Sequence, residues 1–193
     1  MFPNVTAYAA LLFDWDGTVV DSQPMNYRCL AKALGSHGVV LREEWYRARL
    51  GTSVDGLLDE LGAKVSLADV LTRCEQLISQ DLESLQTFPT VVGWAEEAHA
   101  AGVPCAVASG GGGAVVRAGI ASTGLSHLFD VVVTRENVAR GKPAPDLFLE
   151  AARKIGVPPE RCLVIEDAEE GMMAGRAAGM DVVDVRPFVT SSW

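Results

Sequence analysis

The sequence predicts an α/β fold in which a parallel sheet is interrupted, after its first strand, by a helical insertion. Short apolar segments recur along the chain, and each one ends in a polar or glycine-rich turn. Helical patterns separate the later apolar segments. Apolar runs that do not alternate with polar residues suit strands buried on both faces of a parallel sheet. A long strand-free stretch follows the first of them.

The predicted strands are 9–13, 104–108, 131–134, 162–165 and 182–185. Helical patterns fall between the later strands, at 93–101, 114–123, 145–155 and 170–178. Strand and helix therefore alternate, which is typical of a parallel sheet with right-handed crossovers.

The first strand is followed by about 70 residues with no strand candidate, between Asp21 and about Pro89. Four amphipathic segments in this stretch predict helices, at 25–34, 42–50, 54–61 and 67–85. We therefore expect an α/β core of residues 1–20 and 90–193, with a small helical domain at 21–89.

Composition excludes several classes of protein. The 193 residues are 49% hydrophobic and 21% charged, with a formal net charge of -9, which argues against partners such as nucleic acid or an anionic membrane. The four cysteines form no CxxC pair, so neither a zinc site nor a disulfide framework is indicated. The first residues lack the basic segment of a signal peptide. We expect a cytoplasmic protein, a monomer or weak dimer.

Polar residues follow four of the predicted strands, and the carboxyl ends of parallel strands meet at one edge of a sheet. In chain order these residues are Asp14 and Asp16, Ser109 and Gly110, Lys142, and Glu166 and Asp167. Taken alone, each has a plainer explanation, such as a helix cap, a flexible loop or an exposed lysine. Together they give carboxylates, a hydroxyl, a glycine loop and an ammonium group in an order that suits one reaction.

That reaction is magnesium-assisted phosphoryl transfer. Two carboxylates two residues apart, Asp14 and Asp16, can act as nucleophile and as acid/base. Clustered carboxylates require a hard cation such as Mg²⁺. Ser109 and the backbone N–H groups after it can hold phosphate oxygens, and Lys142 can stabilise a phosphoryl group. An aspartyl-phosphate intermediate follows from this set of groups.

The same stretches carry a family resemblance. LLFDWDGTVVDS at 11–22, AVASGG at 106–111, RGKPAPDLFLEAARKIGV at 140–157 and CLVIEDAEEGMMAGRAAGMDVVDV at 162–185 resemble, in the right order, the four motifs of the haloacid dehalogenase superfamily. Within it, the chain is similar to the branch of beta-phosphoglucomutase-like and fructose-1-phosphate-type sugar phosphatases. The resemblance implies a Rossmann-like core and a helical cap at 21–89.

The resemblance also implies a role for each site residue. Asp14 resembles the nucleophile and a metal ligand, and Asp16 resembles the acid/base, which also binds metal through its backbone carbonyl. The remaining matches are Ser109 and the Gly110 N–H as the phosphate clamp, Lys142 as the phosphate-stabilising lysine, Asp167 as a metal carboxylate, and Glu166 as a further ligand or a ligand's partner.

The sequence thus predicts a Mg²⁺-dependent phosphatase that acts on a small phosphorylated sugar or polyol. A hexose-phosphate mutase is the alternative, although Val54 stands near the place where the mutases carry an arginine for a second phosphate. A binding protein that keeps the fold without catalysis is a third possibility, disfavoured by the intact set of site residues. A dehalogenase is disfavoured because Asp16 suits phosphoryl transfer.

Overall fold

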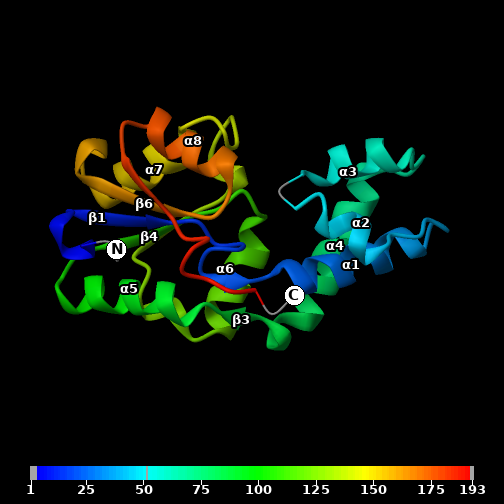
Figure 1. Ribbon diagram of the computed structural model, residues 1–193, viewed down its shortest axis with the longest axis horizontal. Coiled ribbons are helices and arrows are strands. Elements are labelled where there is room, and N and C mark those ends of the chain that lie inside the picture. Colours follow the sequence, from blue (N-terminus) through cyan, green and yellow to red (C-terminus); the bar gives the residue numbers. More distant parts are fainter. Residues whose placement is uncertain (1–3, 51, 192–193) are drawn as a thin grey trace. The chain divides into compact units, whose positions relative to one another are not determined.

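The computed structural model describes residues 4–50 and 52–191, which form two compact units (Figure 1). One unit holds residues 4–21 and 85–191, and it combines a sheet with helices. The other holds residues 22–84 apart from residue 51, and its regular structure is helical. Both units are described below, each by itself.

The first unit is built on a five-stranded parallel sheet. Its strands lie in the order β5-β4-β1-β6-β7, with the bounds Val131–Val133, Cys105–Ala108, Ala10–Phe13, Cys162–Glu166 and Asp181–Asp184. The chain adds β4 and β5 on one side of β1, and then β6 and β7 on the other side. Such a reversal of strand order leaves a crevice at the carboxyl ends of the central strands, where ligands bind in sheets of this kind. The predicted α/β class and parallel sheet are confirmed.

Helices cover both faces of this sheet (Figure 1). Leu11 and Phe13 of β1 face α5 (Pro89–Ala100) and α6 (Gly113–Ser122), and Ala10 and Leu12 face α7 (Asp146–Ile155) and α8 (Glu169–Ala177). Successive side chains of a strand point to opposite faces, so a strand between two layers of helices must be apolar throughout. This explains why the apolar segments of the sequence do not alternate.

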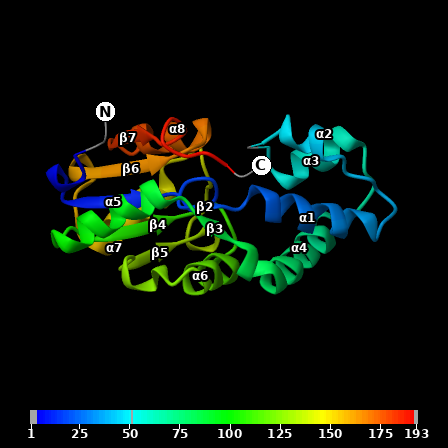
Figure 2. The same cartoon turned by 60° about the horizontal axis from the view of Figure 1, so that its bottom comes forward.

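A small antiparallel pair of strands corrects one prediction. The stretch between Asp21 and about Pro89 was predicted to hold no strand, but β2 (Val20–Asp21) pairs with β3 (Gln86–Thr87), as Figure 2 shows. Val20 pairs with Thr87 and Asp21 with Gln86. Two-residue strands are too short to produce a period in the sequence, so the pattern could not reveal them.

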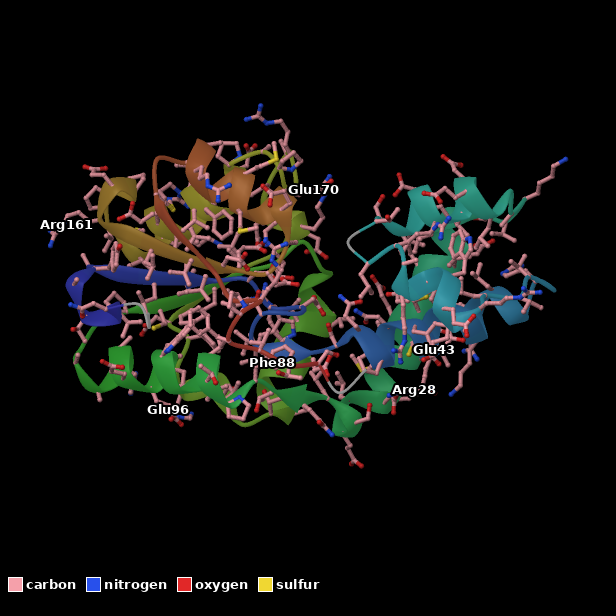
Figure 3. The ribbon with its side chains drawn as sticks, viewed as in Figure 1. Arg28, Glu43, Phe88, Glu96, Arg161 and Glu170 are labelled. Atoms are coloured by element: carbon pink, nitrogen blue, oxygen red, sulfur yellow. The ribbon has the colours of Figure 1, made fainter. Side chains whose placement is uncertain are left out.

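Three helices differ from the predicted bounds by more than two residues. Helix α5 begins at Pro89 rather than at residue 93, because proline is well suited to the first turn of a helix. Phe88, labelled in Figure 3, precedes it and is buried, and its N–H donates to the Val19 carbonyl at 2.9 Å. The segment predicted as a helix over 42–50 is helical only as α2 (Glu43–Arg47), and a turn follows in which the Arg49 N–H bonds to the Tyr46 carbonyl. The segment predicted as a helix over 67–85 is an α-helix only as α4 (Leu67–Asp81), and the 3-10 turn Leu82–Ser84 follows it.

The second unit consists of α1 (Gln23–Gly35), α2, α3 (Val54–Leu61) and α4 (Leu67–Asp81), and ends in the 3-10 turn Leu82–Ser84. Helices α1 and α4 pack against each other, and both bury apolar side chains along one face. Arg28 of α1, labelled in Figure 3, pairs with Asp81 of α4 at 2.7 Å. Among the described residues, no helix has both the length and the apolar character that crossing a membrane requires.

Candidate active site

Three carboxylates gather at the carboxyl ends of β1 and β6. Asp14 follows β1 directly, Glu166 is the last residue of β6, and Asp167 comes next. The two strands are paired in register, and the Asp14 N–H donates to the Ile165 carbonyl at 2.9 Å. One carboxylate oxygen from each of the three residues lies within 4.8 Å of those of the other two. The parallel register therefore produces the cluster.

Lys142 places its ammonium group among these carboxylates. Its Nζ donates to Oε1 of Glu166 at 2.6 Å and to Oδ1 of Asp14, and only 12% of its side chain is exposed. Burial alone disfavours the charged form, but the nearby charges of Asp14 and Glu166 outweigh it and raise the pKa of Lys142 above its ordinary value. Lys142 therefore stays charged at neutral pH.

Glu166 is held on both of its oxygens. Oε1 accepts from Lys142, and Oε2 accepts from the Ala168 N–H at 2.8 Å. The side chain lies against Gly171 of α8, where the Cβ of any other residue would overlap the carboxylate. Burial raises the pKa of Glu166, and the charge of Asp14 raises it further. In this arrangement Glu166 anchors Lys142.

Asp167 is the third carboxylate of the cluster. Oδ1 of Asp167 accepts from the Thr18 hydroxyl at 3.0 Å, and its carboxylate packs on Gly17, which has a left-handed φ of 87° and no room for a Cβ. Burial raises the pKa of Asp167 to about 7, with further contributions from the charges of Asp14 and Glu166. Carboxylates that crowd each other in this way fit a hard divalent cation, which prefers oxygen ligands and offsets their repulsion.

Asp16 belongs to a different part of the site. The turn that holds it is closed by the Gly17 N–H, which donates to the Val20 carbonyl at 2.8 Å, and by a β-bridge between Asp16 and Val20. Its carboxylate points toward Gly111, because a Cβ built on Gly111 would lie 3.5 Å from Oδ2 of Asp16. Asp14 and Asp16 thus face different neighbours, as their spacing predicts.

The loop after β4 starts with Ser109, which is buried and whose N–H donates to the Val133 carbonyl at 3.0 Å. The Ser109 hydroxyl oxygen accepts from the Gly111 N–H at 3.0 Å, which leaves its own proton to be donated. Gly110 has no atom within 4 Å of the place where a Cβ would stand. A Cβ built on Gly111 would lie 3.2 Å from the Ser109 hydroxyl oxygen and 3.5 Å from Oδ2 of Asp16, so the loop that holds Ser109 and Gly110 lies beside Asp16.

The structure brings Asp14, Lys142, Glu166 and Asp167 into direct contact or close proximity, and Asp16 lies near the Ser109–Gly113 loop. Sequence reasoning missed two residues that contact these carboxylates, Thr18 and Gly171. Thr18 is part of the stretch LLFDWDGTVVDS, and its hydroxyl was readable as a partner for a neighbouring carboxylate. Gly171 carried no signal beyond being a glycine inside a helix.

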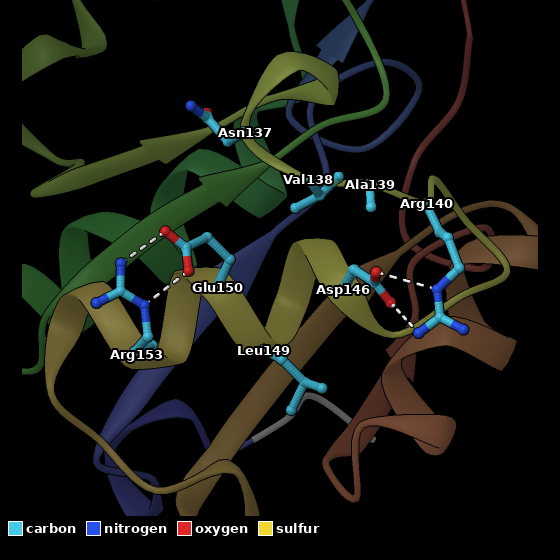
Figure 4. Close-up of a pocket in the computed structure, with 8 residues that line it drawn as sticks. All are labelled: Asn137, Val138, Ala139, Arg140, Asp146, Leu149, Glu150 and Arg153. Carbon is cyan, nitrogen blue, oxygen red and sulfur yellow. Dashed lines mark hydrogen bonds and ion pairs between the residues drawn. The ribbon is translucent and has the colours of Figure 1, made fainter.

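A separate groove of about 410 Å³ lies along α7 (Figure 4). Arg140 pairs with Asp146 at 2.8 Å, and Arg153 pairs with Glu150 at 2.7 Å. Leu149, also in its lining, is partly exposed. The lining includes none of the carboxylates described above, so this groove is distinct from the candidate site.

Comparison with known proteins identifies the class. The sequence model of the family of haloacid dehalogenase-like hydrolases matches residues 11–185 of this chain, and the chain belongs to this family. The predicted family is confirmed.

Among curated relatives, fructose-1-phosphate phosphatase YqaB of Escherichia coli (strain K12) is 36% identical over 185 residues, which cover 93% of this chain and 97% of the relative. Hexitol phosphatase A of the same organism is 34% identical, over 90% of this chain and 81% of the relative. The solved structure of CbbY from Rhodobacter sphaeroides with phosphate has a TM-score of 0.81 and 27% identity, covering 91% of this chain and 84% of that one. The chain is an enzyme of the phosphatase class.

Proposed function

We propose that this enzyme is a Mg²⁺-dependent phosphatase that hydrolyses a small phosphorylated sugar or polyol through an aspartyl-phosphate on Asp14. The observation that carries the proposal is the contact of Lys142 with Asp14 and Glu166, close to the Asp167 carboxylate. A fixed ammonium group beside crowded carboxylates suits a site that accepts both a phosphoryl group and a divalent cation. The substrates in the names of the relatives, fructose 1-phosphate and hexitol phosphates, support the substrate class.

In the proposed first step, a carboxylate oxygen of Asp14 attacks phosphorus, and the bond between phosphorus and the ester oxygen breaks. Asp16 gives its proton to the departing oxygen, which leaves as the sugar hydroxyl. In the second step Asp16 takes a proton from water, the water oxygen attacks phosphorus, and inorganic phosphate leaves as the Asp14 carboxylate is restored. The different neighbours of Asp14 and Asp16 support this division of work.

The other site residues hold the phosphoryl group and the charges around it. Ser109, through its hydroxyl proton, and Gly110, through its N–H, would bind phosphate oxygens. Lys142 is held in place by Glu166 and would offset negative charge near Asp14.

Asp14, Asp167 and the backbone carbonyl of Asp16 would bind Mg²⁺, with Glu166 as a further ligand or as the partner of Lys142. Bound Mg²⁺ would stabilise the charge that builds up between the phosphoryl group and the carboxylates. The helical unit would serve as the cap that the family resemblance implies. A cytoplasmic location and a monomeric or weakly dimeric state are part of the same proposal.

A panel of phosphorylated sugars and polyols, assayed for released inorganic phosphate with Mg²⁺ and with chelator, tests the proposal. We expect turnover only with the metal, and its loss in Asp14→Asn, because an amide is a poor nucleophile. Glu97→Gln, which changes an exposed carboxylate on α5, is the control and should keep full activity.

Acid-quenched enzyme should carry phosphate on the peptide that contains Asp14. Full turnover in chelator, or a well-folded and active Asp14→Asn variant, would refute the proposal. Conversion of one hexose phosphate into another without phosphate release would indicate the mutase instead.

A further inference from the structure

The helix that follows the glycine loop has no capping side chain of its own. Helix α6 begins at Gly113, its N-cap residue is Gly112, and its first turn contains no acidic residue. The first N–H groups of a helix lack partners within it, and a side-chain oxygen at the N-cap normally supplies one. Consecutive glycines also leave the backbone before the helix unusually free to move. The start of α6 therefore needs a partner from elsewhere.

Glu136 supplies this partner from the 3-10 turn Arg135–Asn137, which follows β5. The Gly113 N–H donates to both oxygens of Glu136, at 2.9 Å and 3.1 Å, and the Thr134 hydroxyl donates to Oε2 at 2.8 Å. The Gly113 N–H, the backbone N–H of Glu136 itself and the Thr134 hydroxyl hold the pKa of Glu136 below its ordinary value. The carboxylate is therefore charged at neutral pH, which favours its place at a helix N-terminus.

The end of β5 and the turn after it contact the glycine loop at two other points. The Arg135 N–H donates to the Gly111 carbonyl at 3.3 Å, and the Ser109 N–H donates to the Val133 carbonyl at 3.0 Å. The fit at Gly113 is close, since a Cβ there would lie 2.8 Å from the Thr134 hydroxyl oxygen. The end of β5 and the turn after it thus fix the loop at its start, in its middle and at the first residue of α6.

We infer that Glu136 is a positioning residue, which fixes Gly113 and through it the Ser109–Gly112 loop in the geometry that receives the substrate phosphate. The inference rests on the proposed function, because Glu136 acts through the loop. The Gly113 N–H is taken by Glu136 and the Gly111 N–H by the Ser109 hydroxyl oxygen, which is compatible with the phosphate contacts at Ser109 and Gly110 in the proposed function.

Kinetics of Glu136→Ala and Glu136→Gln test this role, with Glu97→Ala and Glu97→Gln as matched controls on the exposed face of α5. In Glu136→Ala we expect KM for the best substrate and Ki for inorganic phosphate to rise together by about tenfold to a hundredfold, the worth of a hydrogen bond to a charged group. The kcat should change less. Glu136→Gln should recover most of the loss, because its amide oxygen still accepts from the Gly113 N–H. The controls should match the wild type.

A second measurement does not depend on activity. Protein labelled with ¹⁵N in glycine should show faster amide hydrogen exchange at Gly111 and Gly113 in Glu136→Ala, and wild-type exchange in Glu97→Ala. If the wild type hydrolyses no phosphate ester, the proposed function fails, whereas this readout still reports whether Glu136 fixes the loop. Unchanged glycine exchange in Glu136→Ala overturns the inference. A fall in kcat with unchanged KM and Ki also overturns it.

Discussion

Replacing Gly171 with alanine should destabilise this protein, although the same change usually stabilises a helix. Gly171 lies inside α8, and a Cβ there would overlap the Glu166 carboxylate. The carboxylate cannot move away freely, because Lys142 and the Ala168 N–H hold its two oxygens. The added methyl group must therefore break these hydrogen bonds or push α8 away from the sheet.

The size of the effect follows from the two bonds. A hydrogen bond to a charged group is worth about 1.5–3 kcal/mol, so the loss of both costs about 3–6 kcal/mol. Alanine in place of glycine inside a helix offsets about 1 kcal/mol of this cost. The free energy of unfolding should therefore fall by about 2–5 kcal/mol, which lowers Tm by about 4–20 °C for a chain of this size.

Urea and thermal denaturation in chelator measure this difference without any contribution from bound metal. Gly93→Ala is the matched control, because Gly93 also lies inside a helix, α5, and no atom stands within 4 Å of its added Cβ. It should be neutral or stabilising by up to about 1 kcal/mol. If Gly171→Ala were as stable as Gly93→Ala, the close packing of Glu166 on α8 would be wrong, and with it the account of how Lys142 is anchored.

Other expected outcomes test neighbouring parts of the argument. Lys142→Met leaves Asp14 and Glu166 without their shared cation, and should lower the free energy of unfolding in chelator by about 3–5 kcal/mol; unchanged stability would show that the buried ion pair is not formed. Asp16→Ala should slow the hydrolysis of sugar phosphates by about 10²–10⁴-fold and give a burst of aryl alcohol from an aryl phosphate, whereas equal slowing without a burst would remove its acid/base role. Burial raises the pKa of Cys74 and Cys162 to about 11 and that of Cys105 to about 12, so little of each thiol is in the reactive thiolate form at pH 8. Alkylation of these cysteines by iodoacetamide at pH 8, followed by mass spectrometry, should therefore be at least about tenfold slower in native protein than in urea-unfolded protein.

Much of the fold was predictable because buried parallel strands leave a strong signal. Strand β1 is apolar at all four positions, since Leu11 and Leu12 face opposite layers of helices. Strands β2 and β3 gave no such signal, because each is only two residues long and the two are far apart in the sequence. Helix α5 begins at Pro89, before its predicted start at residue 93, because proline fits the first turn of a helix.

The site divides in the same way. Asp14, Glu166 and Lys142 were predicted to meet because residues that follow parallel strands meet at one edge, and the structure brings them together. The partners that fix them were not predictable. Gly171 matters through the space it leaves empty, and Glu136 matters because a helix elsewhere in the chain lacks its own cap. Both depend on distances between segments, which a pattern of residue types does not encode.

The pairing of β2 with β3 holds together the two points of the chain between which the helical unit is inserted. The helical unit, residues 22–84, is inserted between Asp21 of β2 and Gln86 of β3. These two residues are Cα partners in an antiparallel ladder, where facing residues lie about 4.5–5.5 Å apart. Any inserted segment whose two ends meet at that spacing satisfies the same junction, whatever its length or internal structure. The sheet, with its carboxylates and glycine loop, does not need to change when the insert does. A different insert joined at the same two residues would therefore leave the fold of the sheet, and the cluster of carboxylates at its edge, in place.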